Sequence, residues 1–593
     1  MENSESGAGP VVAPGPWAEY ACRLAGRQAE AARLARRAGA LDRSRAAALA
    51  IVVGLAWLAE KERLLPVLLV LPIALFLVYL YRRNRTRRLR ERTARASAFY
   101  ARRLDRLTDR WAGTGEQGTA FLQDNHPCAA DLDLFGPGSL FERLHLAGTP
   151  LGAKTLAGWL RTPAGPAQVR ARQAAVAELR DRLDLREDLA VLGAAVPTWL
   201  DSEALAAWGR GVGSGSNGIR LAAVGLAILS LIAFIAWAWG VSPVPLLGML
   251  ALEGALAVYL RGRTRRVLAA APPTGVELTA LAAVFARVEQ EPFTCPLLRR
   301  LTSAPGPAAS RRLASLGRLL NRRALTPLTF PLLGATRLAL ALERWHSACG
   351  AAMAGWLAAL GDLEALCALA AYAYENPDDT FPDVVAEGPR FEADGLGHPL
   401  LPAARCVRNN LRLDAEVRVL VVSGSNMSGK STLLRAVGAN AVLALAGGPV
   451  RARKLCLAPL TVGATLRVQD SLLGGQSRFF AEVTRIRRLL ELARAGPHLF
   501  LLDELFSGTN SDDRRVGAEA VVHCLLDAGA IGLLTTHDLA LTRLAETLPP
   551  RVANVHFAEQ FEGDVMTFDY LMRPGVPHRS NGLALMRALG IEV

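Results

Sequence analysis

Long apolar runs alternate with arginine-rich stretches in the first half of the chain. Residues 46–59 are apolar, four charged residues follow, and residues 64–81 are apolar again. A helix that spans a bilayer needs about 20 apolar residues, with about 17 as the lower limit. The second run meets this limit, and the first meets it if Arg43 and Arg45 extend to the membrane surface. The pattern predicts a transmembrane hairpin over 44–81.

A second pair of apolar runs predicts another hairpin, over 219–260. Residues 221–239 and 243–260 are both long enough to span, and the second run contains Glu253 near its middle. An ionisable side chain at that depth is a candidate functional group, for example in proton transfer or transport. The alternative is a carboxyl that is protonated or paired within the helical bundle.

Arginines flank both pairs on their outer sides. They are Arg23, Arg27, Arg33, Arg36, Arg37, Arg82, Arg83, Arg85, Arg87, Arg88 and Arg90 around the first pair, and Arg210, Arg220, Arg261, Arg263, Arg265 and Arg266 around the second. Because basic residues favour the cytoplasmic side, we expect both ends of each hairpin there. This predicts a multi-pass protein of the cell (inner) membrane, with the lipid bilayer as a partner. For the first pair, one span plus a surface helix is the alternative.

The remaining stretches before residue 390 have the apolar spacing of helices. Residues 336–374 read as one long helix, and residues 381–402 read as a linker. The predicted organisation is a basic N-terminal segment (1–43), hairpin 44–81, a first helical part (82–218), hairpin 219–260, a second helical part (261–390) and a nucleotide-binding domain (391–593).

The nucleotide-binding prediction depends on one loop, residues 424–432, with the sequence Gly-Ser-Asn-Met-Ser-Gly-Lys-Ser-Thr. It fits the phosphate-binding pattern G-x-x-x-x-G-K-S, between an apolar strand-like run and a helix-like stretch. Gly424 and Gly429 allow backbone N–H groups to surround a phosphate at a helix N-terminus. Lys430 is expected at the outer phosphates, and the Ser431 hydroxyl is expected to hold Mg²⁺. The expected ligands are therefore ATP and Mg²⁺.

Two further apolar strands end in residues that suit ATP hydrolysis. Residues 499–504 end in Asp503, expected to contact Mg²⁺ through water, and in Glu504, expected to orient and polarise the attacking water. Residues 531–536 lead to His537, which could sense the terminal phosphate or be structural.

Residues 472–482 contain small residues before a helix and suggest a second anion site, with Ser477 at its centre. Such a segment does not easily reach the phosphate loop of its own chain. We therefore expect a homodimer in which two chains enclose ATP between them.

Composition changes this picture little. The mean hydropathy is +0.22 although the formal charge is +14, and membrane segments flanked by arginines explain both values. The eight cysteines are scattered without a C-x-x-C pair, which favours reduced thiols over a metal site.

Together these motifs resemble the MutS family, the ABC-type ATPases of DNA mismatch repair. The loop is similar to the family's Gly-Pro-Asn-Met-Gly-Gly-Lys-Ser-Thr, and it retains Asn426, Met427 and Thr432. Other similar segments are 477–482, 503–504 with 508–512, 535–537 and 570–584, and more weakly 152–176. The resemblance implies an α/β P-loop ATPase domain of ABC/MutS type, preceded by an all-α core and lever region that transmembrane helices interrupt.

The resemblance also implies residue roles, and the sequence departs from the family pattern at two points. Tyr570 would stack on adenine from one side, whereas the position on the opposite side, usually aromatic in the family, corresponds to Cys406 by the resemblance. No segment before residue 125 resembles the mismatch-reading domain, and the second hairpin falls where the family carries its DNA clamp. The resemblance therefore implies a membrane-anchored relative without mismatch reading.

Any DNA binding is accordingly expected to be weak, indifferent to mispairs and made to phosphates by exposed arginines. Two alternatives do not involve DNA. One is an ABC-transporter half, although only about 40 residues separate Lys430 from Leu472, which leaves no room for that family's inserted helical domain. The other is a nucleotide-switched membrane scaffold.

Overall fold

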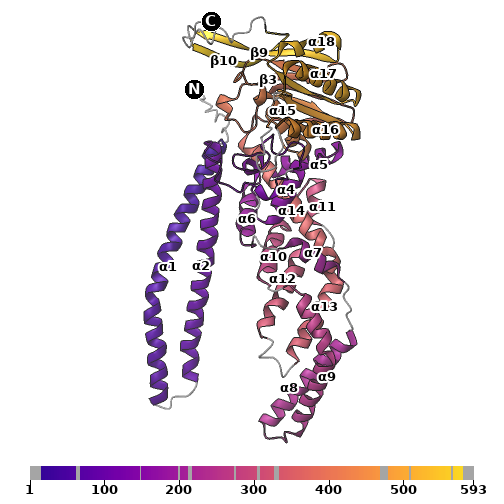
Figure 1. Cartoon of the computed structure of the whole chain (residues 1–593). Helices are drawn as coiled ribbons and strands as arrows, with labels where there is room; N and C mark the ends of the chain where they lie inside the picture. The colour runs from indigo at the N-terminus through magenta and orange to yellow at the C-terminus, as the bar shows by residue number, and fades with distance from the viewer. Residues whose placement is uncertain are drawn as a thin grey trace, which may run out of the picture. The chain divides into compact units, whose positions relative to one another are not determined.

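The computed structural model of the chain describes residues 15–61, 67–123, 125–146, 148–197, 201–211, 217–272, 275–303, 308–325, 333–467, 478–506, 509–562 and 565–577. The chain divides into two compact units, of which one joins the N-terminal helices to residues 184–196 and the other contains the rest (Figure 1). The order of elements is a mostly helical region followed by a C-terminal α/β domain, as the sequence predicts.

The N-terminal unit is built from two long helices and one short helix. These are α1 (Pro16–Lys61), α2 (Val67–Leu107) and α6 (Leu183–Gly193). A buried polar network joins them, because the Tyr100 hydroxyl donates to Glu187 at 2.6 Å and Arg27 lies 2.7 Å from the same carboxylate. The residues between the two predicted spans, 62–66, lie outside the described part of the chain.

Helices make up the first part of the second unit. They are α3 (Leu140–Leu144), α4 (Pro150–Arg161), α5 (Pro166–Arg180), α7 (Ser202–Arg210), α8 (Asn217–Ala238), α9 (Val244–Ala270), α10 (Val276–Val288), α11 (Pro296–Thr302), α12 (Ala309–Asn321), α13 (Gly334–Cys349) and α14 (Met353–Glu375). The fully buried Glu364 of α14 accepts hydrogen bonds from Thr149 and Gly152 at the start of α4, and burial raises its pKa to about 8.

The prediction of one long helix over 336–374 is confirmed for most of its length and is wrong only at the 3₁₀ turn Gly350–Ala352. The helix is interrupted between α13 and α14 at Gly350, where α7 packs closely. A Cβ atom at Gly350 would lie 2.5 Å from the carbonyl oxygen of Gly209, and one at Gly209 would lie 2.6 Å from that of Gly350. Only glycine permits so close an approach of the two backbones.

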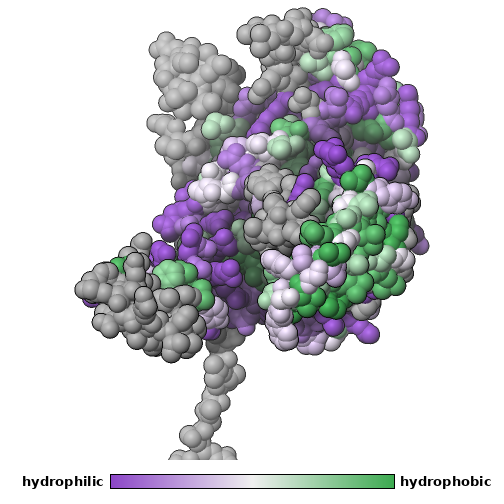
Figure 2. Space-filling model, turned by 90° about the horizontal axis from the view of Figure 1, so that it is seen from below, coloured by the Kyte–Doolittle hydropathy of each residue, from purple (hydrophilic) through white to green (hydrophobic). Residues whose placement is uncertain are grey.

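Three helical segments of the described residues are long and apolar enough to cross a membrane: Leu221–Ala238, Val244–Ala270 and Gly334–Glu375. The third is mostly buried within the protein and belongs to its core. Helices α8 and α9 instead leave most of their apolar side chains exposed, among them Ile232, Val258 and Tyr259. Seen from below, hydrophobic surface gathers on one part of the molecule (Figure 2).

The C-terminal domain contains a six-stranded sheet in the order β10-β9-β4-β8-β7-β6, parallel except for β10. Its strands are β4 (Val419–Ser423), β6 (Thr461–Thr465), β7 (His498–Asp503), β8 (Ile531–Thr536), β9 (Val552–Glu562) and β10 (Val565–Pro574). The register pairs Asp503 with Thr535 and Ser423 with Thr536. The carboxyl ends of the three central strands therefore meet at one edge.

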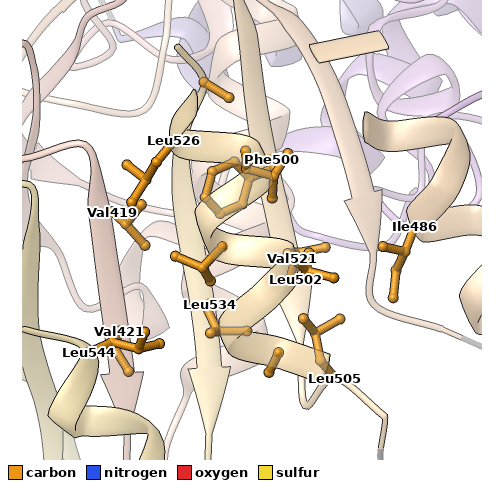
Figure 3. Close-up of a cluster of buried hydrophobic side chains, with 14 of the residues drawn as sticks. Val419, Val421, Ile486, Phe500, Leu502, Leu505, Val521, Leu526, Leu534 and Leu544 are labelled. Atoms are coloured by element: carbon orange, nitrogen blue, oxygen red, sulfur yellow. The ribbon is translucent and has the colours of Figure 1, made fainter. Parts of the chain in front are cut away.

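A continuous hydrophobic core covers one face of this sheet. The helices that cover it are α16 (Arg478–Ala495), α17 (Ser511–Asp527) and α18 (Leu544–Thr547), while α15 (Lys430–Ala446) packs on the sheet as well. Figure 3 shows Phe500, Leu502 and Leu534 of the sheet beneath Val521 and Leu526 of α17. Nearly continuous apolar strands are the pattern of a parallel sheet covered by helices.

The prediction of a linker over 381–402 is also wrong, because this segment forms part of a second, four-stranded sheet. The strands are β1 (Asp383–Val384), β2 (Phe391–Leu396), β3 (Asn409–Leu413) and β5 (Lys454–Leu457), in the order β1-β5-β2-β3. Buried Asn440 of α15 connects to this region by donating to the Gly397 carbonyl and accepting from the Arg451 N–H.

Candidate nucleotide site

The loop between β4 and α15 has the backbone of an anion-binding turn. The φ angles of Gly424, Met427 and Gly429 are +149°, +70° and +104°. A Cβ at Gly424 would lie 2.9 Å from the Ser428 Oγ, and one at Gly429 would lie 3.2 Å from the Tyr570 ring. The glycine positions of the pattern are therefore required by the geometry. The buried hydroxyls of Ser425 and Ser428 have no hydrogen-bond partner among the described residues, so they are available to a polar ligand.

Lys430 lies inside the loop. Its Nζ donates to the carbonyl oxygens of Gly424 and Ser425 at 2.7 and 2.9 Å, and it lies 3.7 Å from the Glu504 carboxylate. Burial lowers the pKa of Lys430, and the carboxylates of Glu504 and Asp503 oppose that shift. The ammonium is thus held where a phosphate would enter.

Asp503 joins the loop to the end of β7. The Ser431 hydroxyl donates to one of its carboxylate oxygens at 2.7 Å, and the Thr535 hydroxyl donates to the other. Thr535 also accepts from the Glu504 N–H at 3.1 Å. The register of β7 and β8 therefore fixes both carboxylates beside α15.

Glu504 has two basic neighbours. His537 Nδ1 lies 3.5 Å from its Oε1, the same carboxylate oxygen that Lys430 Nζ approaches at 3.7 Å. The other ring nitrogen of His537 lies 3.4 Å from Arg514, which donates to the carbonyls of Phe506 and Thr509. A general base needs such orientation by its neighbours.

Tyr570 enters the site from the edge strand β10. The pairing of β10 with β9 is irregular between Phe568 and Met572, and Tyr570 in this bulge has φ of +56°. Asn409 of β3 holds the bulge, donating to the Tyr570 carbonyl at 3.0 Å and accepting from the Met572 N–H at 2.7 Å. Bulges commonly redirect a side chain in this way.

These groups line one cavity of about 720 Å³. The phosphate loop, Asp503 and Glu504 form one end, and Tyr570 lies on its wall together with Leu401, Arg405 and Val407. The volume and the mixture of apolar and charged walls suit a nucleotide.

Strained backbone is concentrated here. Of the eight described non-glycine residues with positive φ, four lie at this site: Met427, Glu504, Phe506 and Tyr570. Such conformations persist where the surrounding structure imposes them, and they gather at functional sites.

The donor set fits Mg²⁺ bound with a nucleotide. No group of three or more His, Cys, Asp or Glu side chains that could hold a metal occurs in the described residues. The Ser431 hydroxyl and the Asp503 carboxylate supply two oxygens, and Mg²⁺ commonly takes its remaining ligands from water and phosphate.

Comparison with known proteins agrees with this geometry. The family described as MutS domain V matches residues 420–592. A DNA mismatch repair protein MutS of Natronomonas pharaonis is 36% identical over 238 residues, which are 39% of this chain and 27% of the relative. The endonuclease MutS2 of Thermus thermophilus is 36% identical over 207 residues, 35% and 27% of the two chains.

The C-terminal domain of the chain belongs to the MutS family. The alignments span little more than a quarter of each of these two relatives.

In the MutS-type domain most of the predicted site residues lie together. The cavity is lined by Asn426, Met427, Gly429, Lys430, Ser431, Thr432, Asp503, Glu504 and Tyr570. Gly424 accepts a hydrogen bond from Lys430, and His537 lies 3.5 Å from Glu504. Ser477 lies outside the described residues. Cys406 does not line the cavity, although both of its neighbours do, and its thiol lies at the His398 N–H instead.

Several contacts at the site were missed from the sequence. Asn409 and Thr535 hold Tyr570 and Asp503, and Arg514 lies beside His537. None of them belongs to the phosphate-binding pattern. The only signal available was the position of Thr535 two residues before His537 on one predicted strand.

His398 gives a pH dependence that can be measured. It lines the cavity, and burial, with Arg435 nearby, lowers its pKa to about 4. Its Nδ1 accepts from the Leu400 N–H. His398 therefore takes up a proton below about pH 6.5 in the unfolded chain but only below about pH 4 in the folded chain. Between these two pH values the free energy of unfolding falls by about 1.4 kcal/mol for each pH unit.

We expect His398→Asn, which preserves an acceptor for Leu400, to reduce the loss of stability between pH 6.5 and 4.5. Urea unfolding of the detergent-solubilised protein, followed by circular dichroism, measures it. His523→Asn, at an exposed position of α17, is the matched control and should leave the slope unchanged. Equal slopes in all three proteins would contradict the assignment.

Proposed function

We propose that this protein is a membrane-anchored MutS-like ATPase that binds and hydrolyses Mg-ATP in a site completed by a second copy of the chain. The observation that carries the proposal is the contact of Ser431 with Asp503, with Lys430 and Glu504 immediately beside it. This set combines a metal-binding pair, a phosphate-binding cation and a base in one cavity.

The residues suggest how hydrolysis proceeds. The loop N–H groups and Lys430 would bind the phosphates, and Ser431 and Asp503 would hold Mg²⁺, which neutralises developing charge. Glu504 would accept a proton from the attacking water, while His537 and Arg514 keep its carboxylate directed at the terminal phosphate. Tyr570 would stack on the base, with Leu401 and Val407 on another wall.

A second copy is favoured by apolar side chains exposed near the site. Met427 of the phosphate loop is 86% exposed, and Phe479, Phe480 and Val483 at the start of α16 are exposed as well. Apolar side chains gathered in this way commonly mark a protein interface. They lie on the loop and on the helix that follows residue 477, as a sandwiched nucleotide would require.

Glu504→Gln should bind ATP yet lose turnover about 10²–10⁴-fold, because an amide cannot accept the proton of water. ATPase rates and equilibrium nucleotide binding of the full-length protein in detergent measure both effects. Glu519→Gln on α17, which removes a half-buried carboxylate paired with Arg515 away from the cavity, is the matched control. Retained turnover in Glu504→Gln would contradict the assigned base.

Mixing two inactive variants tests the shared site. Lys430→Ala removes the loop function and Ser477→Ala the function of the second segment, so a mixed dimer still contains one intact composite site. Recovery of activity on mixing is the expected result. No recovery, together with an active monomer by light scattering, would contradict the shared site.

Membrane anchoring is supported by the exposed apolar surface of the α8–α9 hairpin. Many of its apolar side chains are exposed, whereas its buried positions include Ser230 and Glu253, whose side-chain oxygens have no hydrogen-bond partner among the described residues. Polar groups inside and apolar groups outside are typical of helices in lipid. The flanking arginines favour a cytoplasmic ATPase domain.

Cysteine labelling tests this topology. An impermeant maleimide applied to intact cells should label Ser242→Cys, at the exposed turn between α8 and α9, after removal of the outer permeability barrier where there is one. Ser347→Cys, exposed on α13, should react only after lysis. Labelling of Ser347→Cys in intact cells, or labelling of Ser242→Cys only after lysis, would contradict the topology.

A DNA-related role is the second candidate, favoured by exposed arginines on α11 and α12. They are Arg299, Arg300, Arg311, Arg312 and Arg318. The relatives named above include mismatch repair proteins, but no aromatic residues are interleaved with these arginines. We infer contacts to phosphates, independent of sequence and mispairs.

Equilibrium titration with matched and mismatched duplexes at two salt concentrations tests this inference. Affinity should be equal for both duplexes and should fall steeply as salt rises. Arg311→Ala with Arg318→Ala should weaken binding, whereas Arg487→Ala on α16 should not. A mismatch preference of about tenfold, or about 1.4 kcal/mol, would contradict the inference.

A further inference from the structure

One fully buried carboxylate outside the nucleotide cavity connects the helical region to the MutS-type domain. Asp131 lies before α3, which packs on α4 and α14. One of its oxygens accepts from the backbone N–H groups of Leu466 and Arg467, at 2.9 and 2.8 Å, just after β6. The other oxygen accepts from Arg485 of α16.

The segment around Asp131 is attached to the sheet at further points. The Pro127 carbonyl accepts a hydrogen bond from the Ala464 N–H at 2.9 Å, which attaches the segment to the backbone of the edge strand β6. Leu132 packs so closely on α15 that a Cβ at Gly438 would lie 2.6 Å from it. Asp133 lies 2.7 Å from Arg467. The segment therefore moves with the sheet edge.

Helix α16 carries this connection to the catalytic turn. Glu482, three residues before Arg485 and thus on nearly the same side of the helix, accepts from the Phe506 N–H at 2.6 Å. Phe506 is buried, has φ of +57°, and packs against the Phe479 ring at 5.8 Å. It follows Glu504 by two residues, and Glu504 itself has φ of +47°.

We propose that Asp131 is a positioning residue that acts through Arg485, α16 and Glu482 to hold the strained turn bearing Glu504. The direction of the Glu504 carboxylate then depends on where the helical region places Asp131. The same contacts transmit a change at the nucleotide site back to α3 and α14. This inference rests on the proposed ATP hydrolysis and assigns its regulation to a segment remote from the nucleotide.

Steady-state kinetics of the full-length protein in detergent test the proposal. Asp131→Asn retains the size of the side chain but can present an N–H donor to Arg485, and Glu482→Gln weakens the next contact. Each should lower kcat about 10–100-fold, as displacement of a catalytic group does. The equilibrium affinity for a non-hydrolysable ATP analogue should stay within about twofold, because the phosphate loop is untouched.

Because Asp131 and Glu482 act through one helix, the double variant should be no slower than the slower single variant. Arg485→Lys leaves the two backbone contacts of Asp131 in place, so it decides the question if Asp131→Asn does not fold. Arg487→Lys, on an exposed face of α16, is the matched control and should keep the wild-type kcat.

The proposal would be overturned if both Asp131→Asn and Arg485→Lys keep the wild-type kcat. It would also be overturned if kcat and nucleotide affinity fall equally, or if the effects of the two single variants multiply in the double variant. Lys430→Ala separates this failure from that of the proposed function. If the wild-type protein shows no hydrolysis that depends on Lys430, the ATPase proposal itself fails.

Discussion

The parallel register of β4, β8 and β7 is the constraint on which the site depends. It places Ser423 beside Thr536 and Asp503 beside Thr535, so that the glycine-rich loop and the carboxylates of Asp503 and Glu504 all lie at one edge of the sheet. Backbone hydrogen bonds set this register, and the apolar side chains of Figure 3 prevent it from slipping, because a shift by one residue would expose them. The chemistry is thus positioned by burial that takes place away from the nucleotide.

Local patterns predicted which residues lie together at the site. The loop, the strand ending in Asp503 and Glu504, and the strand before His537 are each encoded within a few neighbouring residues, so their residue types are sufficient evidence. The four-stranded sheet was missed because β1 and β2 are short, and β1 is completed by pairing with β5, about 70 residues away. Asn409, Arg514 and Asp131 likewise matter only through partners distant in sequence. The break at Gly350 depends on the approach of α7, which no helical period can reveal.

The two halves of the second unit follow opposite rules of burial. In the MutS-type domain Phe500 and Leu534 are buried, and charged groups lie at the surface or in the cavity. In the α8–α9 hairpin Ser230 and Glu253 are buried along with a few apolar residues such as Leu226, and many aromatic and aliphatic side chains are exposed. Water as the surrounding solvent accounts for the first arrangement, and the bilayer that we propose around α8 and α9 would account for the second. Such an apolar solvent would also raise the cost of moving Glu253 outward, which would favour one orientation of the two helices.

The attachment of Tyr570 by Asn409 has a mechanical consequence. Asn409 belongs to the four-stranded sheet, whereas Tyr570 belongs to the six-stranded one, so a single amide side chain spans the joint between them. If the two sheets slide relative to one another by an ångström or so, the Tyr570 ring would move, and its stacking on a bound base would strengthen or weaken. The nucleotide affinity of this chain would then depend on the alignment of the two sheets, even though the phosphates would contact only the loop of the six-stranded sheet.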